Sequence, residues 1–369
     1  MLNGNSIGKA LVLTCFGESH GVCIGAVLDG CPAGLPLTEA DIQGELDRRR
    51  PGFTAVSTKR REEDRVEILS GVYKNYTTGA PICMIVRNFD VEPDAYEKIR
   101  NKPRPGHADY TAHVKYGGHN DPRGGGRFSG RVTAAYVMAG AIAKKLLSLL
   151  GVEILAHTVQ VGKVEVSEQV GHDQIRRNVY QNPVRCAVPE KVDLMEKEIL
   201  RVASKGDSVG GMVEAIALNF PAGIGEPVFD SLDSEIAKMM FNIPAAKGVE
   251  FGAGFRSASL RGSENNDEYA VRKGRIVMLS NNAGGILGGI STGMPILVRV
   301  AFKPTPSISK GQKTVDLTQM EETEIQLTDR HDPCVVPRAV PVVESCLAFV
   351  LADHAIRSGK IPRVLTTVK

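Results

Sequence analysis

Arg104-Pro-Gly-His-Ala-Asp-Tyr110 and Arg123-Gly-Gly-Gly-Arg-Phe-Ser-Gly-Arg131 are the two ends of one stretch of 28 residues. Between residues 104 and 131 the sequence has five Arg or Lys, three His and seven Gly, against two acids. Glycine lets a backbone approach a ligand closely, and guanidinium groups bind carboxylate or phosphate with paired hydrogen bonds. The apolar run 132–150 then predicts a buried helix that ends at Gly151. A basic loop that enters a helix N-terminus favours an anion site, although a solvated, flexible basic loop is the alternative.

The composition is that of a globular protein with a local, not a global, excess of positive charge. The 369 residues include 42% apolar and 24% charged side chains, and the formal net charge is only +3. With 5% aromatics and no Trp, the chain offers few stacking platforms, which argues against a general nucleic-acid binder. The seven Cys follow no CxxC or zinc spacing, so we expect no metal site. Without a signal peptide or an uninterrupted apolar run of transmembrane length, we expect a cytoplasmic protein that binds no membrane.

The expected strands come in pairs and do not alternate regularly with helices. Strands are expected at 10–16, 22–28, 66–72, 81–86, 152–166, 212–218, 276–279 and 294–302, and helices at 38–50, 132–150, 194–204, 232–241 and 344–358. Segment 167–190 is polar and is expected at the surface, and His354 is expected to be partly exposed on the last helix. This order predicts an α+β fold with antiparallel sheets, in a single domain that spans residues 1–369.

A five-residue turn, Gly17-Glu18-Ser19-His20-Gly21, joins the first two expected strands. It matches the G-x-S-x-G pattern of a nucleophile elbow, so a serine hydrolase that uses Ser19 is one alternative function. An elbow usually follows several strands of its sheet, whereas only one expected strand precedes this turn. His20, on a turn bordered by glycines, is a candidate general acid or base.

Three consecutive arginines, Arg48 to Arg50, end the expected helix at 38–50. Cations suit a helix C-terminus, and Pro51 ends the helix. Adjacent side chains splay around a helix, so at least one arginine should point into any nearby cleft. The mixed charges that follow at 60–65 are interpreted as a self-paired surface.

Three later segments combine constrained backbone with chemically active side chains. Segment 281–293 is Gly-rich but contains neither a P-loop nor a G-x-G-x-x-G motif. Lys303-Pro-Thr-Pro-Ser307 presents a lysine and hydroxyls on a rigid turn, and segment 330–338 places an arginine at each end with His331 and Asp332 between them. A polar segment as constrained as 330–338 is more often a site than plain surface. For 303–307 a plain strand-to-loop exit explains the prolines equally well.

These motifs together resemble the chorismate synthase family. The matching stretches are Phe16-Gly-Glu-Ser-His-Gly21, Asp47-Arg-Arg-Arg-Pro-Gly52, Arg104-Pro-Gly-His-Ala-Asp-Tyr110, Arg123-Gly-Gly-Gly-Arg127, Asn282-Ala-Gly-Gly-Ile-Leu-Gly-Gly-Ile-Ser291, Arg330-His-Asp-Pro-Cys334 and Arg338-Ala-Val-Pro341. They follow the family's order from near the start to near the end. The resemblance therefore covers essentially the whole chain.

The resemblance implies a lyase of the shikimate pathway to aromatic amino acids. Family members eliminate phosphate and the C6 proton from 5-enolpyruvylshikimate 3-phosphate, by a 1,4-anti elimination that gives chorismate. They require reduced FMN without net redox change, and they are homotetramers whose subunits are β-α-β sandwiches. The sequence leaves two alternatives open, that the enzyme reduces its own flavin with NADPH or that it takes up flavin reduced elsewhere. The absence of a recognisable reductase domain favours the second, with NADPH as an indirect reductant. Two carboxylates and two phosphates would have to be balanced by the arginine clusters. A basic nucleic-acid-binding module, suggested by the Arg-Gly-Gly-Gly-Arg run, stays a second alternative.

The resemblance also implies catalytic roles for four residues. His20 matches the histidine proposed to protonate the departing phosphate, and His107 matches the one proposed to protonate reduced flavin near N1. Asp332 and Ser19 match a relay proposed to deprotonate flavin N5.

The resemblance further implies ligand contacts and two departures from them. The implied FMN contacts are Arg127, Phe128, Ser129, Pro244, Ala245, Gly288, Lys303, Pro304, Thr305, Pro306, Ser307 and Arg330; the implied substrate contacts are Arg48, Arg49, Arg131 and Arg338. Phe128 stands where many relatives have a small residue. Residues 53–56 are uncharged where many relatives have another basic residue. The resemblance implies no metal.

Overall fold

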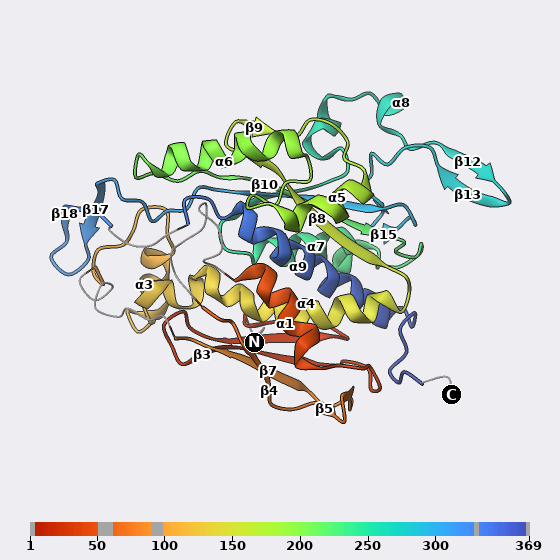
Figure 1. Ribbon diagram of the computed structural model, residues 1–369, viewed down its shortest axis with the longest axis horizontal. Helices are drawn as coiled ribbons and strands as arrows, with labels where there is room; N and C mark the ends of the chain where they lie inside the picture. Colours follow the sequence, from red (N-terminus) through yellow and green to blue (C-terminus); the bar gives the residue numbers. More distant parts are fainter. Residues whose placement is uncertain (1–3, 51–61, 90–98, 328–331, 367–369) are drawn as a thin grey trace.

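The computed structural model describes residues 4–50, 62–89, 99–327 and 332–366. Within these ranges two five-stranded antiparallel sheets enclose a layer of helices (Figure 1). The first sheet has the order β1-β2-β3-β7-β4, with β1 at Ser6–Ile7, β2 at Val12–Gly17, β3 at Cys23–Asp29, β4 at Val66–Ile68 and β7 at Ile82–Arg87. The second has the order β11-β16-β10-β8-β9, with β8 at Glu153–Val161, β9 at Val164–Glu165, β10 at Gly211–Leu218, β11 at Ala246–Phe251 and β16 at Ile296–Phe302.

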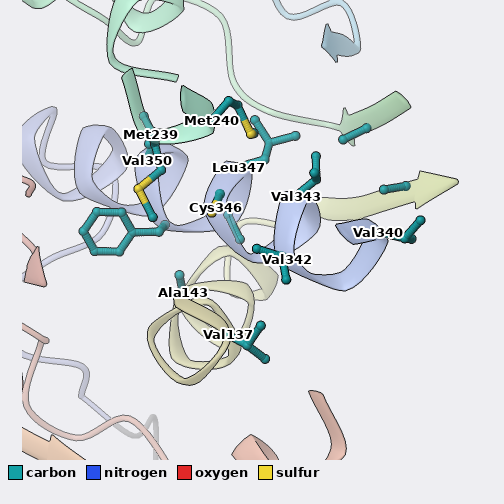
Figure 2. Close-up of a cluster of buried hydrophobic side chains, with 14 of the residues drawn as sticks. Val137, Ala143, Met239, Met240, Val340, Val342, Val343, Cys346, Leu347 and Val350 are labelled. Carbon is teal, nitrogen blue, oxygen red and sulfur yellow. The ribbon is translucent and has the colours of Figure 1, made fainter. Parts of the chain in front are cut away.

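Four helices fill the space between the sheets. They are α1 (Glu39–Arg49), α4 (Thr133–Ser148), α7 (Leu232–Phe241) and α9 (Val336–Arg357). α4 and α9 are apolar on nearly all sides because α4 packs against the first sheet, α9 packs against the second, and each packs against the other. Figure 2 shows part of this contact, where side chains of α9 meet Val137 and Ala143 of α4 and Met239 and Met240 of α7.

The remaining elements lie outside this layer. α6 (Pro189–Ala203) packs against β8 and β9 on the outer side of the second sheet (Figure 1). Three shorter helices are α3 (Asp109–Tyr116), α5 (His172–Asn178) and α8 (Gly262–Asn265). The two-stranded hairpins are β5 (Val72–Tyr73) with β6 (Tyr76–Thr77), β12 (Tyr269–Arg272) with β13 (Arg275–Met278), β14 (Ile286–Leu287) with β15 (Ile290–Ser291), and β17 (Gln312–Asp316) with β18 (Glu321–Ile325). The β12–β13 hairpin projects from the body of the molecule.

The predicted α+β class and antiparallel pairing are confirmed. β2 and β3 are antiparallel neighbours joined by the turn at residues 18–22, and α4 occupies most of the predicted apolar run. α1 begins after Thr38, whose backbone N–H donates to the Asp41 carboxylate at 2.7 Å. Ile42 and Leu46 of this helix are fully buried. The local patterns therefore place both the first hairpin and α1 correctly.

Three expectations were wrong, each because tertiary packing outweighed the local pattern. Segment 167–190 is not only surface: part of it forms α5, and Ile175, Val184 and Cys186 within the segment are buried. The last helix begins at Val336, since Pro337 lies in its first turn, where a helix needs no N–H from that residue. His354 is 2% exposed and its Nε2 lies 3.1 Å from the Glu235 carboxylate.

By length and composition α9 could cross a membrane, but its whole apolar window is buried inside the structure. The buried core helix of a globular protein can have the same length and apolar composition, and α9 is a core helix of this kind.

Candidate active site

A cavity of about 770 Å³ collects residues from segments that are far apart in the sequence. Its wall includes the first hairpin, the end of α1, the 104–131 stretch, the residues after α7, segment 303–307 and the start of α9. This volume lies within the range of roughly 300–1,000 Å³ that is typical of ligand pockets. All but one of the motif segments singled out above reach this wall; the Gly-rich segment 281–293 does not.

His20 and His107 face this same cavity, and adjacent glycines pack against them. Gly124 has φ +58, and a Cβ added there would lie 2.4 Å from His20 Cδ2. Gly125 has φ +82, and a Cβ added there would lie 3.0 Å from His107 Nε2. Because neighbouring residues touch the two rings, the glycines of Arg123-Gly-Gly-Gly-Arg127 are needed both for their left-handed backbone and for the space they leave.

His107 is held by a carboxylate from its own motif. Its Nδ1 lies 2.6 Å from Asp109 Oδ1, and Arg104 donates to the same carboxylate from Nε at 2.7 Å and from Nη2 at 2.9 Å. Burial would raise the pKa of Asp109, but the hydrogen bonds from Arg104 and His107 outweigh it and hold that pKa well below its ordinary range. Burial lowers the pKa of His107, and the hydrogen bond to Asp109 partly offsets this. An ionised Asp109 accepts from Nδ1–H, so the arrangement turns Nε2 toward Gly125 and the cavity.

Ser19 is buried beneath the cavity and does not line it. Its Oγ is 3.1 Å from Ser129 Oγ, and its exposed fraction is 0%. The turn that carries it joins two antiparallel strands, whereas a nucleophile elbow joins a strand to a helix with the serine exposed. The serine-hydrolase alternative therefore has no support in the structure.

Arg49 and Arg131 share one buried carboxylate. Arg49 Nη1 donates to Asp64 Oδ2 at 2.8 Å, and Arg131 Nη1 donates to Asp64 Oδ1. Arg49 also donates to Thr133 Oγ1 at 3.0 Å, and Arg131 Nε donates to Asn88 Oδ1 at 2.9 Å. Burial lowers the pKa of Arg49 to about 10, although Asp64 works in the opposite direction. Both arginines line the cavity. Because these hydrogen bonds come from the protein itself, the positions of the two guanidinium groups are set before any ligand is bound.

Positive charge exceeds negative charge around the cavity. Over the ranges that the structure describes, seven cationic side chains line it: Arg49, Arg104, Arg127, Arg131, Lys247, Lys303 and Arg338. Four carboxylates in the same part of the chain pair with them: Glu62 with Arg131, Asp64 with Arg49 and Arg131, Asp109 with Arg104, and Asp332 with Arg338. The cations thus outnumber the carboxylates by three over these residues, so the cavity favours a ligand with several negative charges. Among the described residues no cluster suited to a metal ion is found.

One part of the wall suits a flat ring with an anionic tail. Phe128, Tyr136, Ile243, Pro244 and Val342 contribute apolar surface. Beside them lie Ser129, Ala245, Thr305, Pro306 and Ser307, together with Lys303, whose Nζ donates to the Gly106 carbonyl. Burial, with repulsion from Lys247, lowers the pKa of Lys303. Arg127 donates to the carbonyl oxygens of Gly17 at 2.9 Å and Cys15 at 3.0 Å, which ties this wall to the first sheet.

Three of the implied contact residues that the structure describes are not found in this wall. Arg48 lies outside the cavity, with its guanidinium 4.4 Å from the Tyr180 ring and an ion pair to Glu45 at 2.9 Å. Pro304 is exposed between the lining residues Lys303 and Thr305, and Gly288 is exposed on the β14–β15 turn. Arg330 and the departure at 53–56 lie outside the described residues.

Several residues of the site were not predicted from the sequence. Glu62 and Asp64, interpreted above as part of a self-paired surface, are 4% and 1% exposed and bind arginines of the cavity. Asp109 was part of a quoted motif but received no role. Tyr136 and Asn242 line the wall and approach each other, with the Tyr136 hydroxyl 3.5 Å from the Asn242 carbonyl. A sequence signal existed only for the acids: three arginines in a row need nearby carboxylates if they are to be buried.

Comparisons with known proteins agree with this geometry. The family model described as chorismate synthase matches residues 11–356. A chorismate synthase of Dehalococcoides mccartyi (strain ATCC BAA-2100 / JCM 16839 / KCTC 5957 / BAV1) is 54% identical over 361 residues, which is 98% of this chain and 99% of the relative. One of Korarchaeum cryptofilum (strain OPF8) is 56% identical over 357 residues, 97% of this chain and 99% of the relative. A solved structure described as the crystal structure of chorismate synthase superposes with a TM-score of 0.75 at 34% identity, over 95% of this chain and 93% of that one.

Proposed function

The chain belongs to the chorismate synthase family, and we propose that the cavity between His20 and His107 is where it eliminates phosphate from 5-enolpyruvylshikimate 3-phosphate. The family's enzymes are lyases of aromatic biosynthesis that convert this substrate to chorismate. One observation carries the assignment of the site: two histidines from motifs almost ninety residues apart face one cation-lined cavity and touch adjacent glycines.

Arg49, Arg131 and Arg338 bind the substrate's anionic groups in this proposal. The substrate has two carboxylates and a phosphate, and the three guanidinium groups line one cavity. Arg49 and Arg131 are held by Asp64, and Arg338 is held by Asp332. Planar guanidinium groups fixed in this way match carboxylate and phosphate geometry better than flexible lysines would. Arg48, outside the wall, acts on the substrate only through the helix it shares with Arg49.

The cofactor in this proposal is reduced FMN, and the wall fits it. The apolar side chains Phe128, Pro244 and Val342 suit an isoalloxazine ring, while Arg104 and Lys303 are placed to hold a phosphate. Ser129, Ala245, Thr305, Pro306 and Ser307 complete the contacts, and Arg127 orders the backbone beneath them. Held by these residues, reduced FMN would supply transient electron donation to the substrate, without net redox change. NADPH is the indirect reductant, through flavin reduced elsewhere.

The two histidines act as proton donors at different positions. His20 protonates the oxygen of the departing phosphate, because charge develops there as the allylic C–O bond breaks. His107 uses Nε2 to hold a proton near the flavin N1 position, since Nδ1 is committed to Asp109. Asp332 reaches the cavity beside Arg338, and Ser19 reaches it through the hydroxyl of Ser129. These two groups provide the relay that carries a proton away from the flavin N5 position.

Self-association into a homotetramer is part of the proposal. The β12–β13 hairpin projects from the body (Figure 1). Its side chains Tyr269, Val271 and Ile276 are exposed. Apolar side chains on a projecting arm favour contact with another subunit. In such an assembly the exposed Gly288 would contact the flavin of a neighbouring subunit and not that of its own. All seven cysteines are free thiols, which supports a reducing, cytoplasmic location.

The test is a phosphate-release assay with 5-enolpyruvylshikimate 3-phosphate under anaerobic conditions. With reduced FMN we expect phosphate and chorismate in equal amounts, and with oxidised FMN or no flavin we expect neither. Phosphate release at the same rate without flavin would overturn the cofactor proposal. Gel filtration with light scattering tests the assembly, for which a monomer at micromolar concentration would be the contrary result.

A further inference from the structure

We propose that Asp64 is a positioning residue for the substrate, because its single carboxylate joins Arg49 and Arg131 into one fixed pair of guanidinium groups. The inference rests on the substrate role proposed above for these arginines. Asp64 is not one of the residues to which the sequence analysis gave a role, and its own side chain does not line the cavity.

The contacts show a bridge between two separate elements. Asp64 Oδ2 accepts from Arg49 at the end of α1, and Asp64 Oδ1 accepts from Arg131 just before α4. Burial opposes ionisation of Asp64, but both arginines outweigh it and hold the pKa of its carboxyl below the ordinary value. The carboxylate is therefore charged whenever the protein is folded near neutral pH. Each oxygen is used by a different arginine, so neither guanidinium can move without losing the shared partner.

The two arginines need such a partner because they repel each other. Arg49 and Arg131 are 1% and 5% exposed, and Arg131 is among the groups that lower the pKa of Arg49. Water does not screen charges at this depth, so two adjacent cations without an anion would separate. Asp64 bridges the two guanidinium groups directly, while Glu62 lies 3.8 Å from Arg131.

The backbone at Asp64 supports a specific role. Its φ is +48, in the left-handed region that few residues other than glycine adopt and that aspartate tolerates. Gln43 of α1 fixes this conformation: its Nε2 donates to the Asp64 carbonyl at 3.3 Å, and its Oε1 accepts from Val66 N at 3.0 Å. Backbone in sparsely populated regions persists where the surroundings demand it, and such positions gather at functional sites.

Within the described ranges, the arrangement also leaves one donor of Arg49 for a ligand. Arg49 uses Nε for Thr133, one N–H for Asp64, one for the Gly130 carbonyl at 3.0 Å and one for the Arg131 carbonyl at 3.5 Å. A guanidinium has five N–H groups. The fifth is oriented by the contacts just described and belongs to a residue that lines the cavity. Asp64 thereby determines where an anionic group of the substrate is received.

The experiment compares Asp64→Asn with Glu344→Gln. Glu344 is an equally buried, cation-paired carboxylate away from the cavity: it is 3% exposed and binds Lys144 at 2.7 Å. We expect Asp64→Asn to raise KM for 5-enolpyruvylshikimate 3-phosphate by about tenfold or more while kcat falls much less. Glu344→Gln should leave KM unchanged, although both variants lower Tm. If Asp64→Asn does not fold, Asp64→Glu keeps the charge with a longer arm, and it should raise KM by a smaller factor.

Double-mutant cycles separate positioning from a general loss of structure. Arg49→Lys and Arg131→Lys are each measured alone and combined with Asp64→Asn. We expect strongly non-additive effects on KM, because the lysine variants already break the pair that Asp64 maintains. Additive effects, or a normal KM in Asp64→Asn while both lysine variants raise it, would overturn the inference alone. A normal KM in both lysine variants would instead overturn the proposed substrate site.

Discussion

Two clusters of buried or partly buried charge lie beside α1 and α4, and they have opposite composition. In the cavity cluster, defined as Arg49, Arg131 and Asp64, two cations share one carboxylate. In the core cluster, defined as Lys144, Glu45 and Glu344, two carboxylates share one cation, with both N–O distances at 2.7 Å. The first borders the cavity, and the second is enclosed by α1, α4 and α9.

The surroundings of each cluster explain the difference. In the core cluster the protein itself compensates both carboxylates: Arg48 forms an ion pair with Glu45 at 2.9 Å, and Glu344 accepts from Ala156 N at 3.1 Å and from the Tyr180 hydroxyl at 3.0 Å. Burial works against the charge on Lys144, but the two glutamates outweigh it and raise its pKa. The cavity cluster borders open space, where Glu62 lies 3.8 Å from Arg131 as a second carboxylate. The excess of cations over carboxylates around the cavity as a whole, among the described residues, indicates the charge of the ligand.

The largest expected effect concerns the chemistry beside the cavity cluster. His107→Ala should lower kcat by about 100-fold or more, as loss of a general acid typically does, with little change in Tm. Steady-state assays and thermal unfolding measure both quantities. The control is His172→Ala, at the first residue of α5 and outside the cavity, which should keep full activity. Unchanged kcat in His107→Ala would exclude this imidazole from the reaction.

The second prediction separates two neighbouring arginines of α1. Arg49→Ala should raise KM for the substrate by about tenfold or more, because a buried, oriented charge is lost from the cavity wall. Arg48→Ala should change KM far less, since its guanidinium rests on the Tyr180 ring outside the cavity. Equal effects of the two substitutions would contradict the placement of the substrate beside the cavity cluster.

The third prediction weakens the core cluster and spares the cavity. Glu344→Gln should destabilise the protein by about 1–3 kcal/mol, because Lys144 then has one ionised partner in place of two. Differential scanning calorimetry should show this as a Tm lower by several degrees with kcat and KM retained. A loss of activity at unchanged Tm would mean that the core cluster serves catalysis as well.

The smallest expected effect is a shift of the pH profile. Asp109 raises the pKa of His107 through their hydrogen bond and its charge, against the lowering by burial. In Asp109→Asn the pKa of His107 should fall further, so the protonated form is lost at lower pH. The descending limb of kcat/KM against pH should then move toward acid. Asp207→Asn, which removes a surface partner of Lys310, is the control and should leave the profile in place.

Local patterns predicted some parts of the site and not others. The hairpin with Ser19 and His20, the helix of Ile42 and Leu46 and the apolar run after Arg131 all follow from short-range periodicity and capping. Asp64 was not identified as a site residue: the three arginines at 48–50 indicated that carboxylates should lie nearby, but nothing in segment 60–65 distinguishes Asp64 from its acidic neighbours. The same limit explains why the burial of His354 was not predicted: its partner Glu235 is more than a hundred residues away in the sequence.

The sequence by itself determined the family, the α+β class and the positions of the histidine and arginine motifs, because these depend on residue order and local spacing. Only the tertiary structure decided which arginines face the cavity, which carboxylates hold them and which ring nitrogen His107 presents. Those outcomes depend on pairs such as Arg49 with Asp64, whose energy arises from burial and distance after the two sheets have closed over the helices.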